Sequence, residues 1–141
     1  MANRSFNRLQ ALDKEVKFLF LHAAITDGSG AAELDNSKSV GIKSISRSAE
    51  GEYDITLGVP GGDTDKYSSL LFVDGIILDG TAITATGGLG FQIEAETVSS
   101  DGVIKIFVLD KEGVRKEVKN GDIMKLMIVV KNSNQPGVGA S

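Results

Sequence analysis

Short stretches in which apolar and polar residues alternate, separated by glycine-bearing turns, constrain the fold of this 141-residue chain more than any other feature. In EYDITLGV, residues 52–59, the side chains of Tyr53, Ile55, Leu57 and Val59 fall on one side of an extended backbone, and Asp54, Thr56 and Gly58 fall on the other. This period of two is typical of a half-buried strand. VGIKSISRS precedes it, and SAEG supplies a turn, so residues 40–59 predict a hairpin.

Two further segments extend this pattern. GFQIEAETV and VIKIFVLD, joined by SSDG, predict a second hairpin over residues 90–110. IMKLMIVVKN is apolar on both faces except for its two lysines, so we expect one face to pack on the core and the other on a second sheet edge or another subunit. The candidate subunit-interface face consists of Ile123, Lys125, Met127 and Val129.

Turn signals between seven to nine expected strands favour an all-β fold. The chain has 17 glycines and is 41% hydrophobic, which suits a globular chain rich in turns. We therefore expect a single β-sandwich or jelly-roll-like domain over residues 15–132, an N-terminal arm over 1–14 and a flexible tail over 133–141. Asp74-Gly75 and Asp79-Gly80 are left open as hairpin turns or as bulges in a longer strand.

The charge of the chain is unevenly placed. Residues 1–17 hold four basic and two acidic residues, a balance of +2, and the rest hold 11 basic and 17 acidic residues, a balance of −6. An overall charge of −4 argues against a nucleic-acid partner, which needs a broad basic surface. No segment has the ~20 apolar residues of a membrane-spanning helix, so no membrane association is expected. The apolar run after Lys17 is at the short limit for a signal peptide and is interrupted by His22, which favours a strand.

Residues for catalysis are scarce. The chain has no cysteine and one histidine, His22, which lies in an apolar strand, and no G-x-S-x-G turn presents a serine nucleophile. We interpret His22 as structural or at the surface. A sequence does not show whether two carboxylates lie as close together as in a glycosidase. A small hydrolase therefore stays open as a further hypothesis, although no catalytic residue is assigned.

The candidate sites for metals and phosphates are weak. Asp27, Asp35, Asp63 and Asp65 lie in turn-like segments but lack the ligand spacing of an EF-hand, and solvated turn aspartates are the favoured interpretation. TGGLGF matches neither G-x-G-x-x-G nor a P-loop. We expect no metal and no cofactor, and infer that the protein binds a partner or acts as a structural scaffold rather than as a catalyst.

The N-terminal stretch MANRSFNRLQALDKEV differs from the rest because it does not alternate. Phe6, Leu9 and Leu12 recur every three residues, on one side of a short helical turn, while Arg4 and Arg8 can pair with acidic groups of a partner. Two interpretations stay open. The arm docks on a partner surface, or it covers an open end of its own sandwich.

MANRSFNRLQALDKEVKFL, GIKSISRSAEGEYDITL, DKYSSLL and MIVVKNS together resemble small structural proteins of tailed bacteriophages that are classed as capsid decoration, or cement, proteins. The resemblance extends over most of the chain, from Met1 to Ser133. It implies a non-enzymatic virion protein on the outer surface of the capsid, made in the bacterial host cytoplasm, that binds the major capsid protein and itself, as a homotrimer. On this basis, Arg4, Phe6, Arg8, Leu9 and Leu12 form the expected capsid-docking arm.

The alternative is a phage fibre or receptor-binding head domain that recognises host surface glycans through loops 60–67 and 85–90. The absence of tryptophan and the presence of only two tyrosines count against it, because sugar rings usually stack on aromatic side chains.

Overall fold

The computed structural model describes residues 16–78 and 90–132 of the chain. Within them it contains eight strands and no helix. The strands are β1 (Val16–Ile25), β2 (Ala32–Leu34), β3 (Ile42–Ala49), β4 (Glu52–Leu57), β5 (Ser69–Leu78), β6 (Gly90–Glu96), β7 (Val103–Leu109) and β8 (Ile123–Lys131). The prediction of an all-β chain is confirmed. The expected arm, residues 1–14, and the expected tail, residues 133–141, lie outside the described residues.

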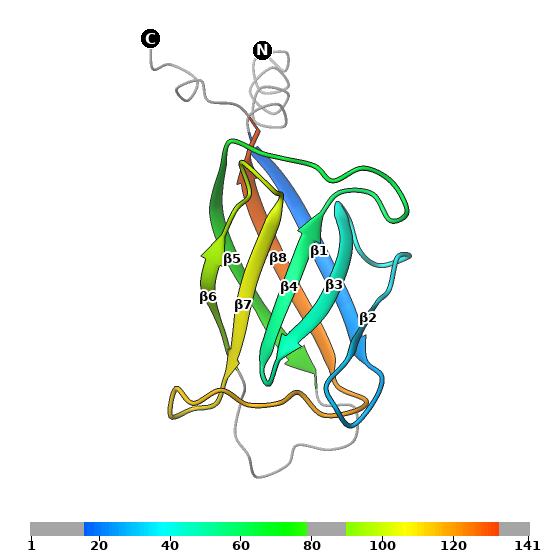
Figure 1. The fold of residues 1–141 in the computed structure, drawn as a ribbon, viewed down its shortest axis with the longest axis vertical. Coiled ribbons are helices and arrows are strands. Elements are labelled where there is room, and N and C mark those ends of the chain that lie inside the picture. Colours follow the sequence, from blue (N-terminus) through cyan, green and yellow to red (C-terminus); the bar gives the residue numbers. More distant parts are fainter. Residues whose placement is uncertain (1–15, 79–89, 133–141) are drawn as a thin grey trace, which may run out of the picture.

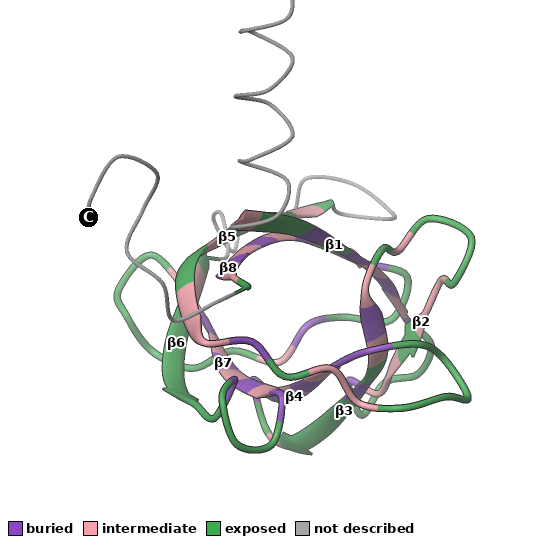
Figure 2. Cartoon of the chain, turned by 90° about the horizontal axis from the view of Figure 1, so that it is seen from above, coloured by how far each residue is buried: buried purple, intermediate pink, exposed green. Residues whose placement is uncertain are grey.

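The strands form two antiparallel sheets packed face to face, a sandwich-like arrangement (Figure 1). Sheet I has the order β2-β1-β8-β5, and sheet II has the order β3-β4-β7-β6. The two sheets come near each other at both sides, where β2 meets β3 and β5 meets β6. Seen from above, the buried segments of both sheets face the space between them (Figure 2).

Both predicted hairpins are confirmed, but β4 ends at Leu57, so Val59 lies beyond the strand and is exposed rather than packed with Tyr53. β3 pairs with β4 from Ile42↔Leu57 to Ala49↔Glu52, and Gly51 closes the turn at a φ of +65°, a conformation that suits glycine because it has no Cβ. β6 pairs with β7. The alternation in β6 breaks at a register shift between Ile93 and Ala95, so this edge strand is mostly exposed.

Asp74-Gly75 is not a turn. Both residues lie inside β5, in regular register with Met127 and Leu126 of β8, and the only register shift of this pair of strands falls between Leu70 and Phe72. The bulge therefore lies at Leu71, three residues earlier than one of the two expected places, and Asp79-Gly80 falls outside the described residues.

One hydrophobic core lies between the sheets. Alternate residues of the central strands point into it and are almost fully buried, which gives each of the larger aliphatic side chains a burial free energy of about 1.5–3 kcal/mol. They are Leu19, Leu21, Ala23 and Ile25 of β1, Tyr53, Ile55 and Leu57 of β4, Ile104, Ile106 and Val108 of β7, and Met124, Leu126, Ile128 and Val130 of β8.

Loops are attached to sheet II by polar contacts. The hydroxyl of the buried Tyr53 donates a hydrogen bond of 2.6 Å to the carbonyl of Gly30, in the loop after β1. The guanidinium of Arg47 on β3 binds the carboxylate of Glu117 through two hydrogen bonds of 2.9 and 2.6 Å. A two-bond pair of this kind fixes the orientation of both groups, so it holds the segment between β7 and β8 against the sheet.

Candidate interaction surface

The outer side of sheet I carries an unusual number of large apolar side chains. Alternation in β1, β8 and β5 places every second residue outward, and the strand register aligns these residues in four rows across the sheet. The rows are Phe18–Val129–Phe72, Phe20–Met127–Asp74, His22–Lys125–Ile76 and Ala24–Ile123–Leu78. We call these twelve residues the apolar face.

The exposed apolar area is large for a surface that meets only water. The side chains of Phe18, Phe20 and Phe72 are 44–49% exposed, and an aromatic side chain has about 150–250 Å² of surface. These three alone therefore present on the order of 300 Å², and Ile76 and Leu78 add to it. The largest apolar patch on a typical monomer is about 300–600 Å² and is often functional. The apolar face reaches the upper part of this range.

The outer side of sheet II is different. Glu52 lies between two cations, with Oε1 3.2 Å from the Lys105 ammonium and Oε2 3.1 Å from the Arg115 guanidinium. Arg115 also stacks over the ring of Phe107 at 4.1 Å. An antiparallel sheet of a solvated sandwich normally has one polar, hydrated face. Sheet II follows this rule and sheet I does not, so the apolar face needs another explanation.

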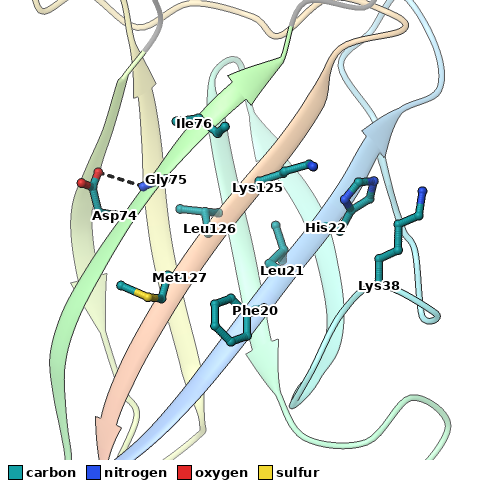
Figure 3. A pocket seen from close by; sticks show the side chains of 10 residues that line it. All are labelled: Phe20, Leu21, His22, Lys38, Asp74, Gly75, Ile76, Lys125, Leu126 and Met127. Carbon is teal, nitrogen blue, oxygen red and sulfur yellow. Dashed lines mark hydrogen bonds between the residues drawn. The ribbon is translucent and has the colours of Figure 1, made fainter.

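A shallow depression of about 480 Å³ lies at the middle of the apolar face. Figure 3 shows its lining side chains, which come from β1, β8 and β5 and from Lys38 beside them. The floor of the depression lies between the second and third rows, where Leu21, Leu126 and Gly75 are in register across the sheet. Gly75 contributes no side chain to it. Its walls are the second and third rows of the face.

The charged groups of the face are unevenly distributed. Lys125 lies in its middle strand with Lys38 at the β1 side, whereas Asp74 lies on β5. The carboxylate of Asp74 accepts a hydrogen bond of 2.8 Å from the backbone N–H of Gly75. No acidic side chain among the described residues lies within ion-pair distance of Lys125.

His22 is in this surface and has a lowered pKa. Partial burial lowers it most, the positive charges of Lys38 and Lys125 lower it further, and Asp35 opposes them. The unfolded chain therefore binds this proton more readily than the folded chain, and the free energy of unfolding falls as the pH drops below the usual histidine value of 6.5.

We expect the His22 imidazole to titrate below 6.5, measured from its ring proton shifts by NMR against pH. Lys38→Gln removes a neighbouring cation, so the pKa of His22 should move upward. Lys43→Gln is the matched control, because the Lys43 ammonium binds the Thr64 hydroxyl rather than approaching His22. A pKa above 6.5, or equal shifts in both variants, would contradict this account.

The turn aspartates have structural partners. The Asp27 carboxylate accepts hydrogen bonds from the Ser29 hydroxyl, at 2.6 Å, and from the backbone of Ala31, and Asp35 accepts one of 2.7 Å from Ser37. These bonds lower the pKa of both carboxyls and are typical of aspartates that stabilise turns. Over residues 16–78 and 90–132, no three histidine, aspartate or glutamate side chains are grouped to hold a metal.

The carboxylates of Glu52 and Asp54 on β4 both approach the Lys105 ammonium, at 3.2 and 3.8 Å. A hydrogen bond from Ser48 and the nearby cations hold the pKa of Glu52 below its usual range. A general acid of a glycosidase needs a raised pKa. Glu52 is therefore unsuited to that role.

The glycan-binding loops predicted for the alternative function are only partly described. In residues 60–67 the one aromatic side chain, Tyr67, is buried and offers no stacking surface. Residues 85–89 lie outside the described part. In the described ranges, no helix is long and apolar enough to cross a membrane.

The predicted interface residues all point outward from β8. Ile123, Met127 and Val129 are partly buried by their neighbours and Lys125 is exposed. The docking-arm residues Arg4, Phe6, Arg8, Leu9 and Leu12 lie outside the described residues, so their role stays a prediction.

Sequence reasoning missed the two flanking strands, β1 and β5, which supply eight of the twelve residues of the face. Phe18 and Phe20 of β1 and Phe72 and Ile76 of β5 are its most exposed members. The signal that could have found them is that VKFLFLHAAI and LLFVDGIIL, like IMKLMIVVK, are apolar on both sides of an extended strand.

Comparisons with protein-family models, curated proteins and solved structures give no match for this chain.

Proposed function

We propose that this protein is a bacteriophage capsid decoration protein, a non-enzymatic component that binds the outer surface of the head and stabilises contacts between major capsid subunits. The observation that carries the proposal is the apolar face, whose large exposed apolar area indicates that this domain works within an assembly rather than alone. The resemblance of the sequence to cement proteins is what implies a capsid as the target.

In this proposal one surface binds the capsid and another joins copies of the protein. Residues 1–14, with Arg4, Phe6, Arg8, Leu9 and Leu12, are the arm that binds the major capsid protein. The apolar face joins copies of the protein; the resemblance implies a trimer, whereas the shape and charges of the face itself favour a pair. When several copies are joined in one oligomer, each makes a modest contact with the capsid, and dissociation of the whole oligomer from the capsid is rare.

A jelly-roll topology is the finer form of the fold that we propose. It is supported by the first and last long strands, β1 and β8, which are neighbours at the centre of sheet I.

The test is binding of the purified chain to capsids stripped of decoration proteins, followed by co-sedimentation. Deleting residues 1–12 should abolish binding while leaving the melting temperature unchanged, because the arm contributes capsid contacts and not core. If the arm instead covers its own sandwich, the deletion lowers the melting temperature. Intact virions should contain hundreds of copies of the protein, and mass spectrometry that finds only a few per particle would contradict a decoration role.

A further inference from the structure

The four rows of the apolar face are arranged symmetrically about its centre. The level of Leu21, Leu126 and Gly75 lies between the second and third rows. Two outward rows lie on each side of it, and the depression is centred on the same level. A surface with this arrangement can be matched by a copy of itself turned end over end.

We propose that the apolar face binds the same face of a second copy of this chain, about a two-fold axis that crosses the strands at the level of Leu126. In this pair β8 lies over β8, β1 over β1 and β5 over β5, with strand directions reversed. Aligned sheets of this kind pack about 10 Å apart and within about 30° of parallel. The contact is isologous, so it closes at two copies.

The sizes of the side chains fit this axis. The first row, with two phenylalanines, lies over the fourth row of the partner subunit, which has smaller side chains. Phe18 meets Ala24 of the partner subunit, and Phe72 meets Leu78 of the partner subunit. Alternating large and small residues across facing layers is how sheets fill the space between them.

The charges fit the same axis. Met127 lies over Lys125 of the partner subunit, which brings Asp74, the β5 neighbour of Met127, within one strand spacing of that lysine, about 4.8 Å sideways. Two Asp74–Lys125 pairs form, one on each side of the axis. An axis parallel to the strands would instead place Lys125 over Lys125 of the partner subunit, and like charges that face each other disfavour association.

The size of the face also suits a second copy. A standard stable interface removes about 800 Å² from each partner, and the apolar core of such an interface is surrounded by polar residues. The exposed apolar side chains supply an area in the upper part of the range of about 300–600 Å², and the polar groups of the face, with Lys38 and Asp74 at the borders, bring the whole face closer to that size. In a three-fold arrangement this flat face would have to pack on a different surface of its neighbour, and the outer side of sheet II is charged.

Sedimentation velocity of the full-length chain over a concentration series tests the pairing. We expect a reversible equilibrium between one 14.9 kDa chain and a species of twice that mass. Met127→Lys puts a charge at the centre of the pair and should raise the dissociation constant about 100-fold, because central interface residues contribute most. Val103→Lys is the matched control, since Val103 points outward from β7 in sheet II, and it should leave the constant unchanged. Far-UV circular dichroism shows that both variants fold.

Charge reversal tests the axis. Asp74→Lys and Lys125→Asp should each weaken the pair about tenfold or more, because each places like charges together. The double variant Asp74→Lys, Lys125→Asp should restore it, since the pair is then re-formed with opposite sign. Lys125→Gln should weaken the pair as well. If Lys125→Gln strengthens it and the double variant does not restore it, the axis runs along the strands and the proposed geometry is wrong.

Other occupants of the face give distinct results. A chain that stays a monomer, but pairs once residues 1–14 are deleted, would have its face covered by its own N-terminal segment. A monomer with either length of chain that loses capsid binding in Met127→Lys would use the face for the capsid. A trimeric mass unaffected by Met127→Lys would place the subunit contact elsewhere. Each of these contradicts the pairing. Capsid binding is measured in a separate co-sedimentation experiment, so a failure of the pairing and a failure of the proposed function can be distinguished.

Discussion

Replacing Tyr53 by alanine is expected to lower the free energy of unfolding by about 3–5 kcal/mol, the cost of removing a large aromatic side chain from a packed core. The side chain is fully buried in sheet II, and its neighbours along β4 and β7 cannot close the space because they are held in register. Urea unfolding followed by circular dichroism measures this loss. A loss below about 1 kcal/mol would show that Tyr53 is not a central core residue.

Tyr53→Phe separates the ring from the hydroxyl. It removes only the 2.6 Å hydrogen bond to the Gly30 carbonyl, which leaves that buried acceptor without its donor and costs about 1–3 kcal/mol. Tyr67→Phe is the matched control, because Tyr67 is also buried but its hydroxyl forms no hydrogen bond with another described residue. Equal losses in the two variants would contradict a special role for the bond to Gly30.

Tyr53→Phe should also change how the free energy of unfolding depends on pH in the alkaline range. Burial raises the pKa of Tyr53 from 10.0 to about 12. The folded state thus holds this proton more tightly than the unfolded state, so the contribution to stability is fully present below pH 10 and is lost as the pH rises to about 12. A shift of this size corresponds to about 3 kcal/mol. The stability of Tyr53→Phe should therefore fall less steeply over this range.

Replacing Gly75 by alanine is the second large effect that we expect, a loss of about 1–3 kcal/mol, as for other overpacked sites. A Cβ at this position would fall well inside contact distance of the Lys125 carbonyl oxygen and 3.0 Å from the Leu126 Cα. Both are backbone atoms of β8, the strand between β1 and β5, so neither can move without disturbing sheet I. The midpoint of urea unfolding measures the loss.

Gly90→Ala is the control for this substitution. Gly90 is also in a strand, β6, but an added Cβ there meets no atom within 4 Å. Alanine also reduces the freedom of the unfolded chain, so this variant should be neutral or slightly stabilising. If Gly75→Ala behaves like Gly90→Ala, the close approach of β5 and β8 does not constrain position 75.

Local patterns predicted the hairpins correctly. The alternation of Tyr53, Ile55 and Leu57 and the turn at Gly51 predict β3 and β4 and place the side chain of Tyr53 on the same side as Ile55 and Leu57. These features could be read because a hairpin joins neighbours in sequence and its turn depends on a few residues. The prediction from Asp74-Gly75 was wrong because it, too, was based on a few neighbouring residues. A dipeptide favoured in turns was kept in a strand because the lack of a Cβ lets β8 pass close by.

The sequence by itself therefore determined the all-β class of fold, the two hairpins and the outward position of Met127 and Lys125 on β8, because all of these follow from the period of two and from turns between neighbouring segments. Only the tertiary structure decided that β1 and β5 flank β8 and bring Phe18 and Phe72 to the two sides of Val129. Those pairings join segments far apart in the chain, and their register depends on the packing of the whole core. A pattern within one strand carries no information about which strands become its neighbours.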